Sequence, residues 1–179
     1  MKEAFKLTPG ESKTISTKDV PTVMVQLVVE EAKAGGSYSA SLGAIASRGS
    51  IVGGKTQWLG PWLGNGPDLV VKNTSASGGP ALSGVILGGT RLATGFSTQF
   101  PTTAGQTMNL TIYNTSALHP ADTLVWCGAE TSDPKRYEVP VGATPFQTTM
   151  ACDGKFLNVT NSTPSGLGAA IAVVAVPAA

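Results

Sequence analysis

The sequence predicts an all-β fold built from two tandem antiparallel β-sandwiches. Short runs in which apolar and polar residues alternate recur along the 179 residues, and turn-forming residues separate nearly all of them. No window longer than a few residues has apolar residues at the three- and four-residue spacing of a helix. An alternating run that ends in asparagine and two hydroxyl residues also occurs three times, at residues 69–75, 110–116 and 157–163. Together these features indicate related strand–turn–strand units.

Turn sequences divide the chain into successive strands. In the first half the turns are Pro9-Gly10, Gly35-Gly36, Gly53-Gly54, Asn65-Gly66 and Gly78-Gly79. In the second half they are Ala104-Gly105, Asp133-Pro134 and Asp153-Gly154. We therefore expect strands at residues 12–17, 22–31, 38–47, 55–62, 68–73, 81–88, 91–100, 106–114, 122–129, 136–141, 146–152, 155–160 and 168–176.

The two halves of the chain contain similar phrases in the same order, which indicates an internal duplication. Thr8–Ile15 resembles Thr103–Leu110, residues 21–30 resemble 120–130, residues 62–73 resemble 150–161, and each half closes on a Gly/Ala/Val run at 81–89 or 169–176. We therefore expect a first sandwich over residues 1–90 and a second over residues 91–179, each with five or six strands. One continuous jelly-roll-like sandwich is the alternative.

The composition argues against several functional classes. Charged residues make up 13% of the chain and the formal net charge is +1, with no basic cluster, so neither nucleic acid nor an anionic membrane surface is an expected partner. The first residues show no signal peptide, and the longest apolar stretch, 167–176, is too short to cross a bilayer. We expect synthesis in the cytoplasm and, because few charges oppose association, packing against other subunits.

No residue pattern in the sequence indicates catalysis, a cofactor or a metal ion. The single histidine, His119, precedes a proline in a turn, and no Gly-x-Ser-x-Gly nucleophile motif accompanies it. Gly49–Thr56 formally matches a phosphate-binding loop, but Gly60 and Pro61 prevent the helix that this motif requires. For Cys127 and Cys152 we favour buried free thiols, with a bridge between strands as the alternative. We expect a non-enzymatic protein.

The best candidates for an interface are apolar segments. Trp58 and Trp62 lie close together beside Gly60 and Pro61, where their rings could plug the sandwich, anchor a partner or stack on a sugar. The last strand is apolar on both faces and needs cover on both. The candidate interface residues are Phe5, Leu7, Trp58, Trp62, Leu167, Ile171, Val173, Val174 and Val176.

The opening Thr8-Pro-Gly-Glu-Ser before a strand, the Asn-Thr-Ser turns and the Ala/Gly/Val closing strands resemble structural proteins of tailed-bacteriophage particles. These include capsid decoration or cement proteins and the sandwich modules of neck, tail and fibre. The resemblance implies a virion component that is made in the host cytoplasm, forms a homo-oligomer and binds capsid or tail subunits. The alternative function is a carbohydrate-binding or adhesive module that uses Trp58 and Trp62.

Overall fold

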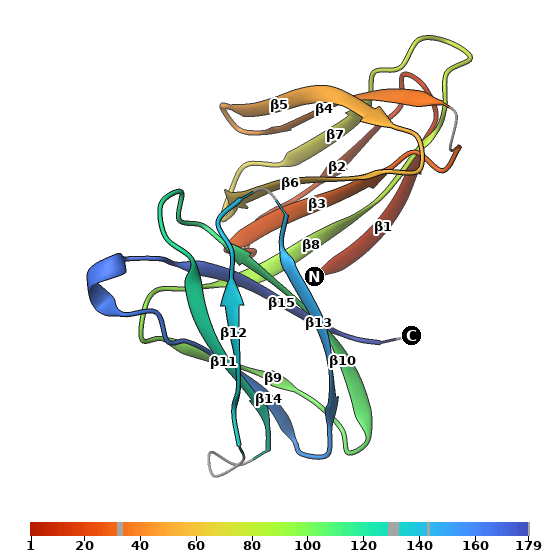
Figure 1. The fold of residues 1–179 in the computed structure, drawn as a ribbon. Helices are drawn as coiled ribbons and strands as arrows, with labels where there is room; N and C mark the ends of the chain where they lie inside the picture. Colours follow the sequence, from red (N-terminus) through yellow and green to blue (C-terminus); the bar gives the residue numbers. More distant parts are fainter. Residues whose placement is uncertain (32–33, 129–132, 143, 179) are drawn as a thin grey trace. The chain divides into compact units, whose positions relative to one another are not determined.

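The computed structural model describes residues 1–31, 34–128, 133–142 and 144–178 (Figure 1). The described residues form fifteen strands and a single 3-10 turn at Ser165–Leu167. The chain divides into two compact units, Met1–Gly88 and Gly89–Ala179, which we call the first and the second unit. The boundary falls within β8 (Leu82–Leu92), so each unit contains one part of that strand.

The first unit is a sandwich of two antiparallel sheets. The strand order in one sheet is β1-β8-β3-β6, and that in the other is β2-β7-β4-β5. Besides the first part of β8, the strands are β1 (Lys2–Leu7), β2 (Ser12–Ile15), β3 (Thr22–Val28), β4 (Gly35–Leu42), β5 (Ile45–Val52), β6 (Thr56–Leu63) and β7 (Leu69–Asn73).

The second unit contains the same arrangement. One sheet has the order β13-β10-β15-β8, with the last part of β8 at its end, and the other has the order β12-β11-β14-β9. Its other strands are β9 (Ser97–Pro101), β10 (Gln106–Asn114), β11 (Ala121–Cys127), β12 (Lys135–Val139), β13 (Phe146–Cys152), β14 (Phe156–Asn161) and β15 (Ile171–Pro177).

Each unit is therefore an eight-stranded jelly roll. Numbering the strands of either unit from one to eight gives sheets of order 1-8-3-6 and 2-7-4-5, so β1 corresponds to the last part of β8, and β2 to β9. The predicted all-β sandwich class is confirmed. The units have more strands than the expected five or six because β1 lies outside the predicted runs, and the runs 38–47 and 91–100 each include a turn between two strands. Instead of one jelly roll along the chain, each unit forms its own.

The strand pairing corrects part of the duplication inferred from the sequence. Gly10 N–H donates to Asn73 O at 2.9 Å, and Gly95 N–H donates to Asn161 O at 2.8 Å, so Gly10 corresponds to Gly95 rather than to Gly105. The similarity of Thr8–Ile15 and Thr103–Leu110 is local, since both begin with the same turn. Thr8 N–H donates to Glu11 Oε2 at 2.8 Å, and Thr103 N–H donates to Gln106 Oε1 at 3.0 Å. The matches at 62–73 with 150–161, and at the closing strands, agree with the topology.

Each unit has its own hydrophobic core between its two sheets. In the first unit the core includes Val25, Leu69 and Leu82, which have no exposed surface. In the second unit it includes Ile112, Leu157 and Ile171, which are equally buried. Alternating strands place these side chains on the inner faces, so the period-two pattern in the sequence reports the core directly.

The three repeated asparagines lie buried at strand ends and connect the two sheets of a unit. The Asn73 amide, on β7, donates to Leu7 O and Pro80 O, both at 3.0 Å, and Asn73 Oδ1 accepts the Ser75 N–H. Asn161 makes the equivalent bonds to Leu92 O and Ala169 O in the second unit, at 3.1 and 2.8 Å. Each asparagine thus satisfies backbone groups that would otherwise be buried without partners.

Asn114 uses the same chemistry at a different place in the fold. Its amide, at the end of β10, donates to His119 O at 2.8 Å and to Val139 O at 3.1 Å, and Asn114 Oδ1 accepts the Ser116 N–H at 2.8 Å. Because Val139 ends β12, this asparagine also joins one sheet of the second unit to the other.

We predict that Asn73→Ala destabilises the first unit, and Asn161→Ala the second, by about 3 kcal/mol or more, because each change leaves two carbonyls and one N–H unpaired in a buried site. Chemical denaturation followed by fluorescence measures the loss. Asn109→Ala is the matched control, since no side-chain hydrogen bond of Asn109 is found among the described residues. An equal, small effect of all three substitutions would contradict the prediction.

Candidate functional site

Of the two candidate tryptophans, Trp62 packs on the core cluster of the first unit, whereas Trp58 is buried but does not belong to that cluster. Trp58 is 9% exposed, and Trp62 is half-buried against the core cluster that contains Leu59. Leu7 is buried in the same cluster, and Phe5 packs on it. These side chains offer little surface to a partner, and the two indoles form no exposed platform for a sugar ring.

The closing strand of the second unit contributes mostly to its own core. The side chains of Ile171, Val173 and Val174 are buried in that strand, and Val176 is half-buried. Ile171 and Val173 belong to the core cluster of the second unit, and Val174 is buried outside that cluster. Of the candidate interface residues, Leu167 is exposed, in the loop that precedes β15.

Cys127 and Cys152 form a disulfide, which corrects the preference for free thiols. Their Cα atoms are 5.3 Å apart, a separation that a disulfide spans without backbone movement. Cys127 ends β11 and Cys152 ends β13, so the bond joins the two sheets of the second unit across a sequence separation of 25 residues. The sequence offered two apolar contexts for the cysteines but not the pairing of sheets that brings them together.

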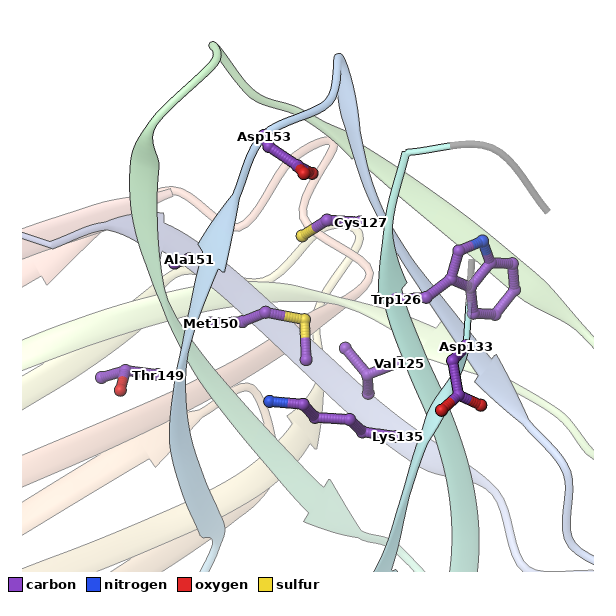
Figure 2. Close-up of a pocket in the computed structure, with 9 residues that line it drawn as sticks. All are labelled: Val125, Trp126, Cys127, Asp133, Lys135, Thr149, Met150, Ala151 and Asp153. Atoms are coloured by element: carbon purple, nitrogen blue, oxygen red, sulfur yellow. The ribbon is translucent and has the colours of Figure 1, made fainter. Parts of the chain in front are cut away.

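A pocket of about 300 Å³ opens in the second unit beside this disulfide (Figure 2). In the figure, Lys135 extends from β12 toward Met150 and Thr149 of β13, and the Trp126 indole lies on the opposite side, above Asp133. The Trp126 indole N–H has no hydrogen-bond partner among the described residues. The residues that line the pocket are Val125, Trp126, Cys127, Asp133, Lys135, Thr149, Met150, Ala151 and Asp153.

The loops at one end of the second unit expose large apolar side chains. Each of the loops 93–96, 115–120, 140–145 and 162–170 presents one such side chain, with exposed fractions from 41% to 80%. Backbone bonds connect three of these loops: Gly95 N–H donates to Asn161 O, directly before the loop 162–170, at 2.8 Å, and Thr115 N–H donates to Ala170 O at 2.9 Å. We call these residues the apolar loop cluster: Phe96, Leu118, Val141 and Leu167.

The corresponding loops of the first unit have the opposite character. By the strand correspondence they are residues 8–11, 29–34, 53–55 and 74–81, and none of their described residues is an exposed large apolar side chain. Their sequence contains five charged residues, whereas the four loops of the apolar loop cluster contain none. One fold thus presents a charged end in the first unit and an uncharged apolar end in the second, so the difference is a property of the sequence and not of the topology.

The residues considered for catalysis occupy turns and strands of the described chain. His119 is an exposed turn residue whose carbonyl accepts the Asn114 amide, and Gly49–Thr56 runs from β5 through a turn into β6. Tyr113 is buried, and desolvation raises the pKa of its phenol. Within the described ranges, no three His, Cys, Asp or Glu side chains gather as they would around a metal ion. Within the same ranges, no helix is long and apolar enough to span a membrane.

Comparison with known proteins finds no family model and no curated protein that matches this chain. Among solved structures, the turret protein A223 of Sulfolobus turreted icosahedral virus shares 14% identity at a TM-score of 0.33, covering 98% of each chain. The tandem CBM22-1–CBM22-2 domains of Paenibacillus barcinonensis Xyn10C share 9% at 0.30, covering 94% of this chain and 83% of theirs. The PBSX exported protein XepA shares 8% at 0.30, covering 98% of this chain and 86% of its own. Scores this low relate the protein to none of the three in function.

We predict that reduction of the Cys127–Cys152 disulfide destabilises the second unit by roughly 3–4 kcal/mol and leaves the first unit unchanged. Without the bond, the unfolded chain regains the entropy that closing a loop of this length removes. Calorimetry with and without a reductant measures the shift. The first unit contains no cysteine and serves as the internal control. A reductant effect on both unfolding transitions, or on neither, would contradict the prediction.

Proposed function

We propose that the protein is a non-enzymatic structural component of a virus particle and that it binds other subunits of the particle through the apolar loop cluster. One observation carries the proposal. At one end of the second unit the loops expose Phe96, Leu118, Val141 and Leu167, whereas the corresponding loops of the first unit contain charged residues. Exposed apolar side chains gathered in one place mark binding surfaces in soluble proteins.

The chemistry of the cluster specifies the kind of partner. None of its four loops contains Asp, Glu, Lys or Arg. Charged groups at the centre of a partner surface would therefore lose their hydration without gaining an ion pair. The partner is therefore an apolar, uncharged protein surface, as between subunits of a shell. Jelly rolls are frequent in viral capsid proteins, but they also occur in lectins and cupins, so the fold alone does not carry the proposal.

We predict that Phe96→Ser combined with Leu118→Ser lowers the affinity for the particle about tenfold or more, because exposed apolar anchors dominate such interfaces. The stability of the isolated protein should change by less than about 0.5 kcal/mol per site, since both side chains already face solvent. Quantitative mass spectrometry of purified particles measures the number of copies incorporated.

The matched control is Lys55→Ser combined with Ala76→Ser, which alters two of the corresponding loops of the first unit. Loss of incorporation with the cluster variant alone supports the proposal. Equal incorporation of both variants, or the absence of the protein from particles made in cells that contain it in quantity, overturns the proposal.

The second candidate function is carbohydrate binding, at the pocket beside the disulfide rather than at Trp58 and Trp62. The observation that favours it is the mixture of groups around the pocket: two carboxylates accept hydrogen bonds, an ammonium and a threonine hydroxyl donate them, and an indole supplies an apolar face. Sugar hydroxyls both donate and accept, and sugar rings stack on indoles, so these residues suit a small polyol.

We predict for this second function that Lys135→Ala weakens the binding of any recognised monosaccharide about tenfold, because it removes the cationic donor of the pocket. A calorimetric screen of monosaccharides against the wild type and the variant provides the measurement. Trp58→Phe, which alters a buried side chain of the first unit, should leave that affinity unchanged. The absence of binding by the wild-type protein would eliminate this function.

A further inference from the structure

The edge strand β5 of the first unit lacks the features that normally prevent strand edges from pairing. Within the described residues, β5 pairs with β4 alone, over all eight residues from Ile45 to Val52. Six of these residues are exposed, including Ile45 and Val52 at 51% and 69%, and Arg48 is the single charged one. A long, nearly uncharged edge strand is a template for another strand.

The other strands that end a sheet carry such protection. β12, which corresponds to β5 in the second unit, has five residues, of which Lys135, Arg136 and Glu138 are charged. The edge strand β6 contains Pro61, which has no N–H to donate. At the edge strand β13, the charged Lys135 side chain of β12 extends toward the strand (Figure 2). β2 has four residues, β9 ends at a proline, and half of the residues of β1 are charged.

The β4–β5 turn determines which backbone groups of β5 are free. Gly43 and Ala44 form a two-residue turn between the paired residues Leu42 and Ile45, and such a turn closes on a pair that exchanges both hydrogen bonds. Hydrogen-bonded pairs alternate along an antiparallel ladder. The backbone of residues 45, 47, 49 and 51 therefore faces β4, and that of residues 46, 48, 50 and 52 faces outward.

We propose that β5 pairs antiparallel with β5 of a second copy of this chain, on a twofold axis that passes beside Gly49. This register places Arg48 opposite Ser50 of the other copy, and Ala46 opposite Val52. All four outward-facing residues then lie opposite one another, and the exposed Val52 side chain gains an apolar neighbour. In the neighbouring register, whose twofold axis passes beside Arg48, the two Arg48 side chains would lie face to face, and like-charge repulsion disfavours that arrangement.

The residues at the centre of the proposed pair suit close approach. Pairs that exchange no hydrogen bond bring their Cα atoms to about 4.5 Å, the narrower of the two spacings. Gly49 occupies this central position, and a Cβ there would lie 3.1 Å from the Tyr38 hydroxyl oxygen of its own chain. The glycine thus leaves room both for Tyr38 and for the second strand.

Three substitutions of Ser50 test the proposal, because its backbone faces away from β4. Ser50→Pro removes an outward N–H and should abolish the dimer without breaking the β4–β5 ladder. Ser50→Glu places a carboxylate opposite Arg48 of the other copy and should tighten the dimer about fivefold. Ser50→Lys should weaken the dimer by a similar factor. In both variants the effect counts twice, because residue 50 of each copy lies opposite Arg48 of the other. Sedimentation velocity over a wide concentration range measures the dissociation constant, and Ser50→Ala is the control.

Opposite effects of Ser50→Glu and Ser50→Lys, reduced at high salt, would support the register even if the proline variant fails to fold. A wild-type protein that stays monomeric at every concentration overturns the proposal. A dimer that all three variants leave unchanged also overturns it, since the interface would then lie elsewhere. The apolar loop cluster is on the other unit, so Phe96→Ser with Leu118→Ser should not alter this dimer.

Discussion

The fold of each unit depends on a buried asparagine that joins its two sheets. Asn73 and Asn161 stand at the ends of corresponding strands. Each amide donates to one carbonyl of the opposite sheet and to one of the following loop, while its oxygen accepts a backbone N–H. A sandwich places apolar side chains between its sheets, but the backbone at the sheet ends still needs partners away from water. One asparagine supplies three of these bonds, because its side chain carries both donors and an acceptor.

Much of this architecture could be predicted from the sequence, because period-two alternation reports which face of a strand is buried. The strands from Gly35 to Leu42 and from Ala121 to Cys127 follow that pattern closely. The correspondence between the halves was partly wrong for a physical reason. The turns at Thr8 and Thr103 use the same side chain-to-backbone bond, yet one follows the first strand of its unit and the other the second. Sequence similarity over a few residues reports local turn chemistry and not position in a topology.

The candidate surfaces could not be predicted in the same way, because exposure depends on pairing between distant strands. Trp62 and Ile171 were candidate interface residues by sequence, but both pack on the cores of their own units. Conversely, Phe96, Leu118 and Val141 are isolated apolar residues in the sequence, and only the jelly-roll order brings their loops to one end. The disulfide follows the same rule, since its cysteines are on strands of different sheets. The two units share one topology but differ in the residues of their loops and edge strands.

The buried asparagines also restrict where the protein can fold. Asn73, Asn114 and Asn161 are each followed by a residue and then a serine or threonine, the acceptor sequence for Asn-linked glycosylation. A glycan on the amide nitrogen would remove a donor that holds the sheets together and would place a sugar in a space without room for it. The disulfide between Cys127 and Cys152, in contrast, requires an oxidant. The disulfide-bonded native state therefore forms where thiols are oxidised and these asparagines stay unmodified.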